Sequence, residues 1–171
     1  MVKKHRIAIF FDQADGTGSA EYKRIKKSTE LTLSFNPETE DFDYIADENP
    51  TTEITKYAPS LEQPLKMYEN EADFKYFWEK CYNLPTGTAA KVPLLIVFMF
   101  GASGSGAEAQ YKAWKVDCMV SFNEMNGVDS ELNFELLFGG TVERGTVKVT
   151  GTAPDYVPVF TADSEGGSMD E

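Results

Sequence analysis

The sequence predicts a mainly β structure with a single α-helix packed over it, and three observations carry this prediction. Residues 114–122 and 132–138 alternate apolar and polar side chains, which is typical of half-buried strands. Residues 92–100 form an almost unbroken apolar run of strand length. Only residues 73–84 repeat apolar side chains at helical spacing. A chain of 171 residues is one domain by length and can bury about 70% of its unfolded surface.

The predicted helix spans about residues 71–84, and both of its ends are marked. Its apolar stripe recurs at i, i+3, i+4 and i+7 and consists of Phe74, Phe77, Trp78 and Cys81. Asn70 is the expected N-cap, with Asp73 three residues later in a variant of the capping box. Pro85 blocks continuation of the helix. A helix this short is not stable alone, so its stripe must lie against the predicted strands.

The first third of the chain predicts short strands. Residues 7–11 form a strand that ends in a turn rich in Gly and Asp at residues 12–20. Residues 21–35 predict a second strand, which is basic in its first half. The apolar face of this second strand is Leu31, Leu33 and Phe35.

A long acidic excursion follows. Residues 36–53 contain two prolines and many acids, and long loops in compact domains are usually functional. Residues 54–67 predict an edge strand interrupted by Pro59 and Pro64, because each proline removes a donor from the strand ladder.

Beyond the helix, the predicted strands are joined by short connections. The strands are expected at residues 92–100, 114–122, 132–138 and 146–150. Small residues at 101–107 and an Asn-Gly turn at Asn126 separate the first three of them. Residues 155–171 mix Pro, Gly, Ser and acids, which predicts a flexible acidic C-terminal tail. The predicted organisation is therefore one β domain at residues 1–154 followed by this tail.

The charge is strongly negative and unevenly distributed. The chain has 28 acidic and 16 basic residues, a net charge of −12, which disfavours general binding to phosphate backbones. Seven of the 16 basic residues lie before residue 28, namely Lys3, Lys4, Arg6, Lys23, Arg24, Lys26 and Lys27. We interpret this cluster as a solvated strand edge, and a binding patch is the alternative.

Cys81 and Cys118 are the only cysteines, and both are expected as buried thiols in a reducing compartment. The basic start of the chain lacks a long apolar region, and no apolar run reaches the length of a membrane span. We therefore expect a soluble cytosolic product without membrane insertion.

The sequence shows no catalytic, cofactor-binding or metal site, and we expect no enzyme. His5 is the only histidine and lies near the N-terminus, a poor position for acid–base or nucleophilic chemistry. The acids of residues 38–48 do not follow the order of a calcium loop. Residues 104–109 match part of a dinucleotide-binding pattern, but Trp114 follows too closely for a crossover helix. We interpret these glycines as a hairpin connection.

The order of segments resembles the major tail protein, or tail tube protein, of long-tailed bacteriophages. The resemblance is carried by a basic strand, the segment NPETEDFDYIADENPTTEITKYAPS, the helix ADFKYFWEKC, a buried strand and a final section ending in Gly-Thr-Val-Lys-Val. It covers about residues 3–150. It implies a β-sandwich-like fold flanked by a helix, in hexameric rings stacked into a hollow tube through which phage DNA passes.

The resemblance also implies contacts and a location. In such proteins a long early loop contacts the neighbouring ring, and the matching residues here include Asn36, Phe42, Tyr44, Ile45 and Asp47. The expected partners are other copies of the chain and the tape-measure, tail terminator and distal tail proteins. DNA passes without sequence-specific binding. The expected location is the virion tail, after synthesis in the bacterial host cytoplasm.

The polar face of one predicted strand pair is a candidate lining of such a tube. Its residues are Asp117, Glu131, Asn133 and Glu135, which lie opposite a clear core face. A negative lining lets a DNA duplex slide, whereas attraction to each phosphate would add up along the tube. An ordinary solvated face is the alternative.

A second function remains open on the residues alone. The chain is then a monomeric β-rich binding module whose basic N-terminal region or acidic loop recognises a protein partner. An enzyme would need a convergent acid–base site, which the sequence does not show.

Overall fold

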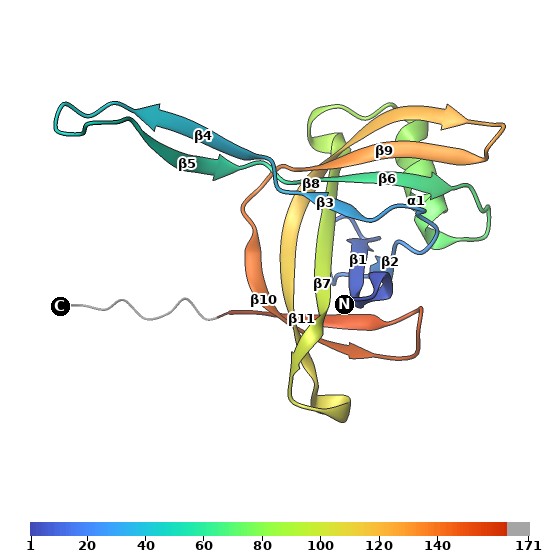
Figure 1. The fold of residues 1–171 in the computed structure, drawn as a ribbon. Coiled ribbons are helices and arrows are strands. Elements are labelled where there is room, and N and C mark those ends of the chain that lie inside the picture. The colour runs from blue at the N-terminus through green and yellow to red at the C-terminus, as the bar shows by residue number, and fades with distance from the viewer. Residues whose placement is uncertain (164–171) are drawn as a thin grey trace.

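The computed structural model describes residues 1–163 and is mainly β, with one flanking α-helix (Figure 1). The strands are β1 (Ile7–Asp12), β2 (Tyr22–Arg24), β3 (Thr32–Ser34), β4 (Pro37–Phe42), β5 (Thr51–Tyr57), β6 (Ser60–Lys66), β7 (Lys91–Ser103), β8 (Gln110–Asn126), β9 (Glu131–Phe138), β10 (Glu143–Thr150) and β11 (Val157–Ala162). The helix α1 spans Ala72–Tyr82, and the 3-10 turns η1, η2 and η3 span Lys4–Arg6, Gly87–Ala90 and Gly106–Glu108. The predicted fold class is confirmed.

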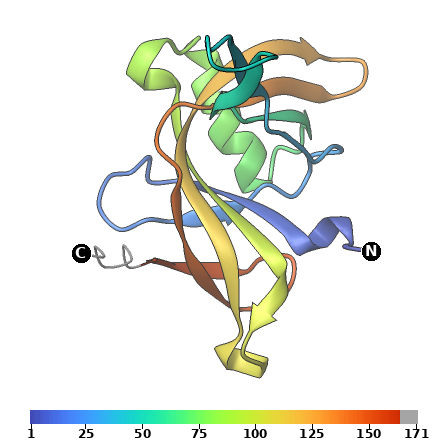
Figure 2. The same ribbon diagram turned by 60° about the vertical axis from the view of Figure 1, so that its left-hand side comes forward.

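One large antiparallel sheet organises the molecule. Its strand order is β2-β1-β7-β8-β9-β6-β3, and β10 pairs with β8 and with β11. The sheet curves around α1, while β10 and β11 lie across the lower half of the long strands (Figure 2). The result is a β-sandwich-like arrangement. β4 and β5 form a separate two-stranded sheet that projects away from it (Figure 1).

The pair β1–β7 is buried on both faces, which explains its unbroken apolar sequence. Ile9 lies opposite Ile96, and both belong to a core that includes Phe77 of α1. Phe10 lies opposite Leu95, and both point into a second core, formed with β10 and β11. Because each face has its own apolar cover, the alternation typical of a half-buried strand is absent here.

The long strand β8 pairs with different strands along its length. Residues 111–115 pair with β10, and residues 118–126 pair with β9. The predicted alternation is confirmed: Val116, Cys118 and Val120 are buried, whereas Lys115, Asp117 and Ser121 are exposed. β9 alternates in the same way, so these two strands give the large sheet one apolar and one polar face.

The helix forms where the sequence predicts it, but its buried face is rotated from the expected stripe. Tyr76 and Phe77 are buried, while Trp78 is 39% exposed. Phe77 stacks on Phe134 with ring centroids 4.3 Å apart and meets Phe11 edge-on at 5.5 Å. The prediction of a buried Trp78 was therefore wrong. The helix is turned so that Phe77 fills the space between Phe11 of β1 and Phe134 of β9, which leaves Trp78 at the surface.

The predicted N-cap was also wrong. The residue at the N-cap is Glu71 instead of Asn70, and no side chain caps the helix there. Asp73 is fully buried and turns inward, where its Oδ2 accepts hydrogen bonds from the backbone N–H groups of Lys26 at 2.8 Å and Lys27 at 3.1 Å. This carboxylate thus fixes the connection that leaves β2, instead of completing a capping box.

The predicted strand at residues 21–35 is divided into β2 and β3 with a non-strand connection between them. The expected long loop at residues 36–53 is instead most of the β4–β5 hairpin. Its register places Pro37 opposite Tyr57 and Phe42 opposite Thr51. Prolines and acids disfavour strands in general, but a hairpin exposed on both sides needs no apolar alternation.

Pro59 separates β5 from β6 as expected, but Pro64 does not interrupt β6. Pro64 lies opposite Asn133 of β9, and its carbonyl accepts a hydrogen bond from the N–H of Thr29 at 3.1 Å. In an antiparallel strand the N–H and C=O of one residue point to the same side. The position without a donor therefore faces away from β9. On that side β3 pairs only with residues 60–62 of β6, so Pro64 removes no hydrogen bond from that pairing.

The predicted flexible tail was wrong over residues 157–162, which form β11 against β10. The pairing brings Phe160 close to Gly145, where an added Cβ would lie 2.6 Å from the Phe160 ring. Glycine at position 145 thus permits the close approach of β11. Residues 164–171 of the predicted tail lie outside the described residues.

The rotated helix face predicts different costs for two neighbouring aromatic residues. Phe77→Ala should lower the free energy of unfolding by about 3–5 kcal/mol, because it empties a fully buried site between two aromatic rings. Trp78→Ala, the matched control, should cost about 1 kcal/mol or less. Urea unfolding followed by circular dichroism measures both. Equal losses would contradict the packing described above.

Candidate functional site

The β4–β5 hairpin, residues 37–57, leaves the body of the molecule with almost all of its side chains exposed (Figure 1). Of the residues predicted in this region, Asn36 lies at its base. The Asn36 side-chain amide donates to the carbonyl of Ala58 at 3.1 Å and to Ser60 Oγ at 3.2 Å. Because Ser60 begins β6, these bonds hold the hairpin to the sheet at its origin.

The other predicted residues lie together at the far end of the hairpin. Phe42 and Tyr44 stack with ring centroids 5.7 Å apart. Tyr44 is 50% exposed, and Ile45 is fully exposed. The N–H of Asp47 donates to the carbonyl of Tyr44 at 2.9 Å, which closes the turn. The structure therefore gathers Phe42, Tyr44, Ile45 and Asp47 into one tip, whose apolar side chains have no partner outside the hairpin in the part of the chain that the structure describes.

The hairpin is also strongly acidic. Between residues 38 and 53 its charged residues are Glu38, Glu40, Asp41, Asp43, Asp47, Glu48 and Glu53, with no lysine or arginine. Glu40 lies directly opposite Glu53 across the strand pair, a placement that disfavours an isolated hairpin. Among the described residues, the one ion pair here joins Lys56 and Glu38 at 3.2 Å.

A groove follows the part of β1 that β2 does not cover, since β2 pairs with β1 only at residues 10–12. The apolar end of the groove is a cavity of about 240 Å³. Its lining includes Ile7, Ile9, Leu31, Phe35, Phe98 and Phe100. Leu31, Phe35 and Phe100 remain substantially exposed at its rim. Exposed aromatic side chains around a concave apolar surface are typical of a binding surface.

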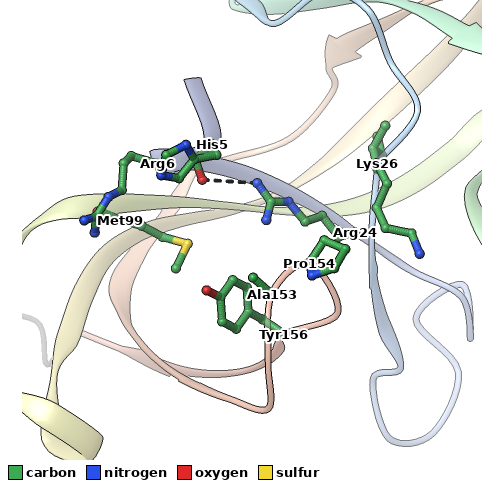
Figure 3. A pocket seen from close by; sticks show the side chains of 9 residues that line it. His5, Arg6, Arg24, Lys26, Met99, Ala153, Pro154 and Tyr156 are labelled. Carbon is green, nitrogen blue, oxygen red and sulfur yellow. Dashed lines mark hydrogen bonds between the residues drawn. The ribbon is translucent and has the colours of Figure 1, made fainter. Parts of the chain in front are cut away.

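The opposite end of the groove is a basic pocket of about 450 Å³ (Figure 3). The Arg24 guanidinium donates to the carbonyl of His5 at 3.2 Å, and Arg6 donates to the carbonyl of Met99 at 3.2 Å. Tyr156 forms part of the far wall. Burial lowers the pKa of Arg24 from its usual value, although the side chain stays charged at neutral pH.

A third cavity of about 530 Å³ joins the two ends. It shares His5, Arg24 and Lys26 with the basic pocket and Ile7, Ile9 and Leu31 with the apolar end. We call the three adjoining cavities the β1 groove. The sequence showed that basic residues cluster near the N-terminus, but folding was needed to place them beside an apolar surface.

The predicted acidic face exists on the outer side of β8 and β9, but its carboxylates differ in their surroundings. Asp117 pairs with Lys91 at 3.1 Å, and Glu131 pairs with Lys66 at 2.9 Å. Glu135 has no ion pair among the described residues. Its direct neighbour is Glu62 of β6, a residue that the sequence analysis did not place on this face. Asn133 donates to Glu124 at 3.0 Å.

The glycine-rich segment and the two cysteines lie in parts of the fold where they have a structural role. Residues 104–109 lie in the connection of the β7–β8 antiparallel hairpin, which confirms the interpretation of their glycines. Cys118 is buried and Cys81 is partly buried, and desolvation raises the pKa of both thiols. Over residues 1–163 the structure has no group of three or more side chains arranged to hold a metal ion. No helix within this range is long and apolar enough to cross a membrane.

The structure thus defines a β-sandwich-like protein with an exposed acidic hairpin and a groove that has one basic and one apolar end. A comparison with models of protein families and with curated protein sequences found no match to this chain. The function is therefore inferred from the residues and from their arrangement.

Two charge reversals on the acidic face should change stability in opposite directions. Glu135→Lys should raise the free energy of unfolding by about 0.2–1 kcal/mol, because it converts the like-charged pair with Glu62 into an opposite-charged one. Glu131→Lys should lower stability, because it removes the partner of Lys66. Urea unfolding at low salt and in 1 M NaCl measures both effects, and the difference should shrink at high salt. The same sign for both variants would argue against the register described.

Proposed function

We propose that this protein is a structural virion protein that assembles with copies of itself into stacked rings, which form the tail tube of a long-tailed bacteriophage. The observation that carries the proposal is the β4–β5 hairpin, whose acidic and apolar side chains make almost no contact with the rest of residues 1–163. Exposing the apolar side chains of Tyr44 and Ile45 to water is unfavourable in free energy. Contact with a partner would bury them and remove this unfavourable term.

Open strand edges support assembly over a monomeric role. β2 and β3 end the large sheet, and among the described strands β11 pairs only with β10. Exposed edges of this kind are sites where strands from another chain add by backbone hydrogen bonds. A contact between two different surfaces of identical copies repeats from copy to copy, and it generates a ring if the rotation closes.

The finer parts of the proposal come from the resemblance. The rings are hexameric, the hairpin contacts the neighbouring ring, and DNA passes through the tube without sequence-specific binding. The tape-measure, tail terminator and distal tail proteins are the proposed further partners. The chain acts in the virion tail and is not an enzyme.

The alternative function is a monomeric binding module, in which the same hairpin recognises a different protein. The two functions differ in a simple observable, because only the first requires assemblies of the purified chain. A module remains monomeric at all concentrations.

Removing the apolar character of the hairpin tip should abolish assembly without unfolding the protein. Tyr44→Ser with Ile45→Ser should reduce rings and tubes seen by electron microscopy to background, while the thermal midpoint stays unchanged. Val128→Ser is the matched control, because Val128 is 94% exposed at the tip of the β8–β9 turn. A wild-type protein that stays monomeric with concentration and mild heating would contradict the proposed function.

Charge reversal on the proposed lumen face should leave assembly intact and hinder DNA delivery. Tubes carrying Glu131→Lys and Glu135→Lys present lysines that attract phosphates along the whole passage. Phage carrying both substitutions should form normal tails and show reduced infectivity. Normal infectivity would show that this face, with Asp117 beside Lys91, is an ordinary solvated surface.

A further inference from the structure

We propose that the β4–β5 hairpin of one copy docks into the β1 groove of a second copy. This inference rests on the proposed function, since it names the surface that receives the hairpin during assembly. The acidic part of the hairpin faces the basic pocket, and the apolar tip faces the cavity lined by Phe35, Phe98 and Phe100.

The first support is a set of cations without counter-ions. Within residues 1–163, Lys4, Arg6 and Arg24 have no carboxylate within 4.0 Å. The two arginines are held instead by the backbone carbonyls of His5 and Met99 (Figure 3). Carbonyl bonds fix the position of each guanidinium and leave its charge uncompensated. Such groups are ready to receive carboxylates.

Lys26, which lines the same pocket, already binds two carboxylates of its own chain. Its ammonium contacts Glu71 at 3.0 Å and Asp155 at 2.9 Å. These hydrogen bonds raise its pKa, and Asp155 contributes the most. Arg24 lines the same pocket, and no carboxylate among the described residues reaches its guanidinium. The open cationic positions therefore lie beside one that is already satisfied.

The second support is the complementary composition of the hairpin. The chain concentrates acids without any lysine or arginine between residues 38 and 53, and Glu40 faces Glu53 with no cation between them. An external cationic surface relieves this repulsion. Because β4 and β5 contact mainly each other, the hairpin does not reach the groove of its own copy.

The third support is that both surfaces combine charge with apolar area. The hairpin carries Phe42, Tyr44 and Ile45 next to its acids, and the groove carries Leu31, Phe35 and Phe100 next to its cations. Charge complementarity selects the partner and its orientation, whereas burial of the aromatic side chains supplies affinity. A partner that was only acidic or only apolar would match one end of the groove and not the other.

A pair of opposite charge reversals tests the contact. The hairpin variant carries Glu40→Lys with Asp43→Lys, and the groove variant carries Lys4→Glu with Arg24→Glu. Each variant alone places like charges opposite one another at the substituted positions, so assembly measured by sedimentation and electron microscopy should fall about tenfold or more. In an equimolar mixture every contact between unlike copies is complementary, and assembly should recover with the two variants alternating.

The controls separate charge effects from folding. Glu69→Lys with Glu79→Lys makes the same change of net charge as the hairpin variant, but at exposed positions outside the groove, and should assemble as the wild type does. Circular dichroism and thermal unfolding identify a groove variant that fails to fold. Lys4→Glu with Arg6→Glu then replaces it, because this variant keeps the bond between Arg24 and His5.

The outcomes distinguish this inference from the proposed function. If both folded variants assemble alone as the wild type does, or if their mixture does not recover, the docking contact is overturned while self-assembly stands. If the wild type never assembles, the proposed function fails. The mixture still tests the contact in that case, because a complex of the two variants in sedimentation supports it and two separate monomers overturn it.

Discussion

The structure depends on the burial of the β1–β7 pair from both sides. Alternate residues of these strands feed two separate cores, one closed by α1, β6 and β9 and the other by β10 and β11. Both cores need the shared pair, because neighbouring residues of β7 point into different cores: Ile96 into the first and Leu95 into the second. Apolar burial of this extent is the dominant favourable term in folding, so every other element takes its place relative to this pair.

Asp73 connects this core to the surface. Its buried carboxylate binds the backbone of Lys26 and Lys27, and in doing so it fixes the segment that forms one wall of the β1 groove. Burying a carboxylate is unfavourable unless hydrogen-bond donors satisfy it, and three backbone N–H groups, those of Lys26, Lys27 and Phe74, do so here. A residue in the first turn of α1 therefore also helps to shape the basic pocket, which Lys26 lines.

The molecule separates its charges in space. Acids dominate the hairpin and the outer face of β8 and β9, whereas cations that have no carboxylate partner within residues 1–163 gather around η1 and β2. Within one monomer these surfaces do not neutralise one another, because the hairpin projects from the body (Figure 1). In the contact that we propose between two copies, these opposite charges would meet and would set the orientation of the two molecules.

The amino-acid sequence was enough to predict the mainly β class, a helix at about residues 71–84, and the strands that alternate or run apolar, because these features follow from local periodicity. It also located the acids and aromatic side chains of the hairpin and the basic N-terminal cluster. The tertiary structure alone decided that Phe77 rather than Trp78 fills the core, that Asp73 turns inward, and that residues 157–162 add a strand. It alone placed Glu62 beside Glu135, and the basic cluster beside Phe98 and Phe100. Periodicity reports which side of an element is apolar, but the contact that each side makes depends on residues far away in the chain.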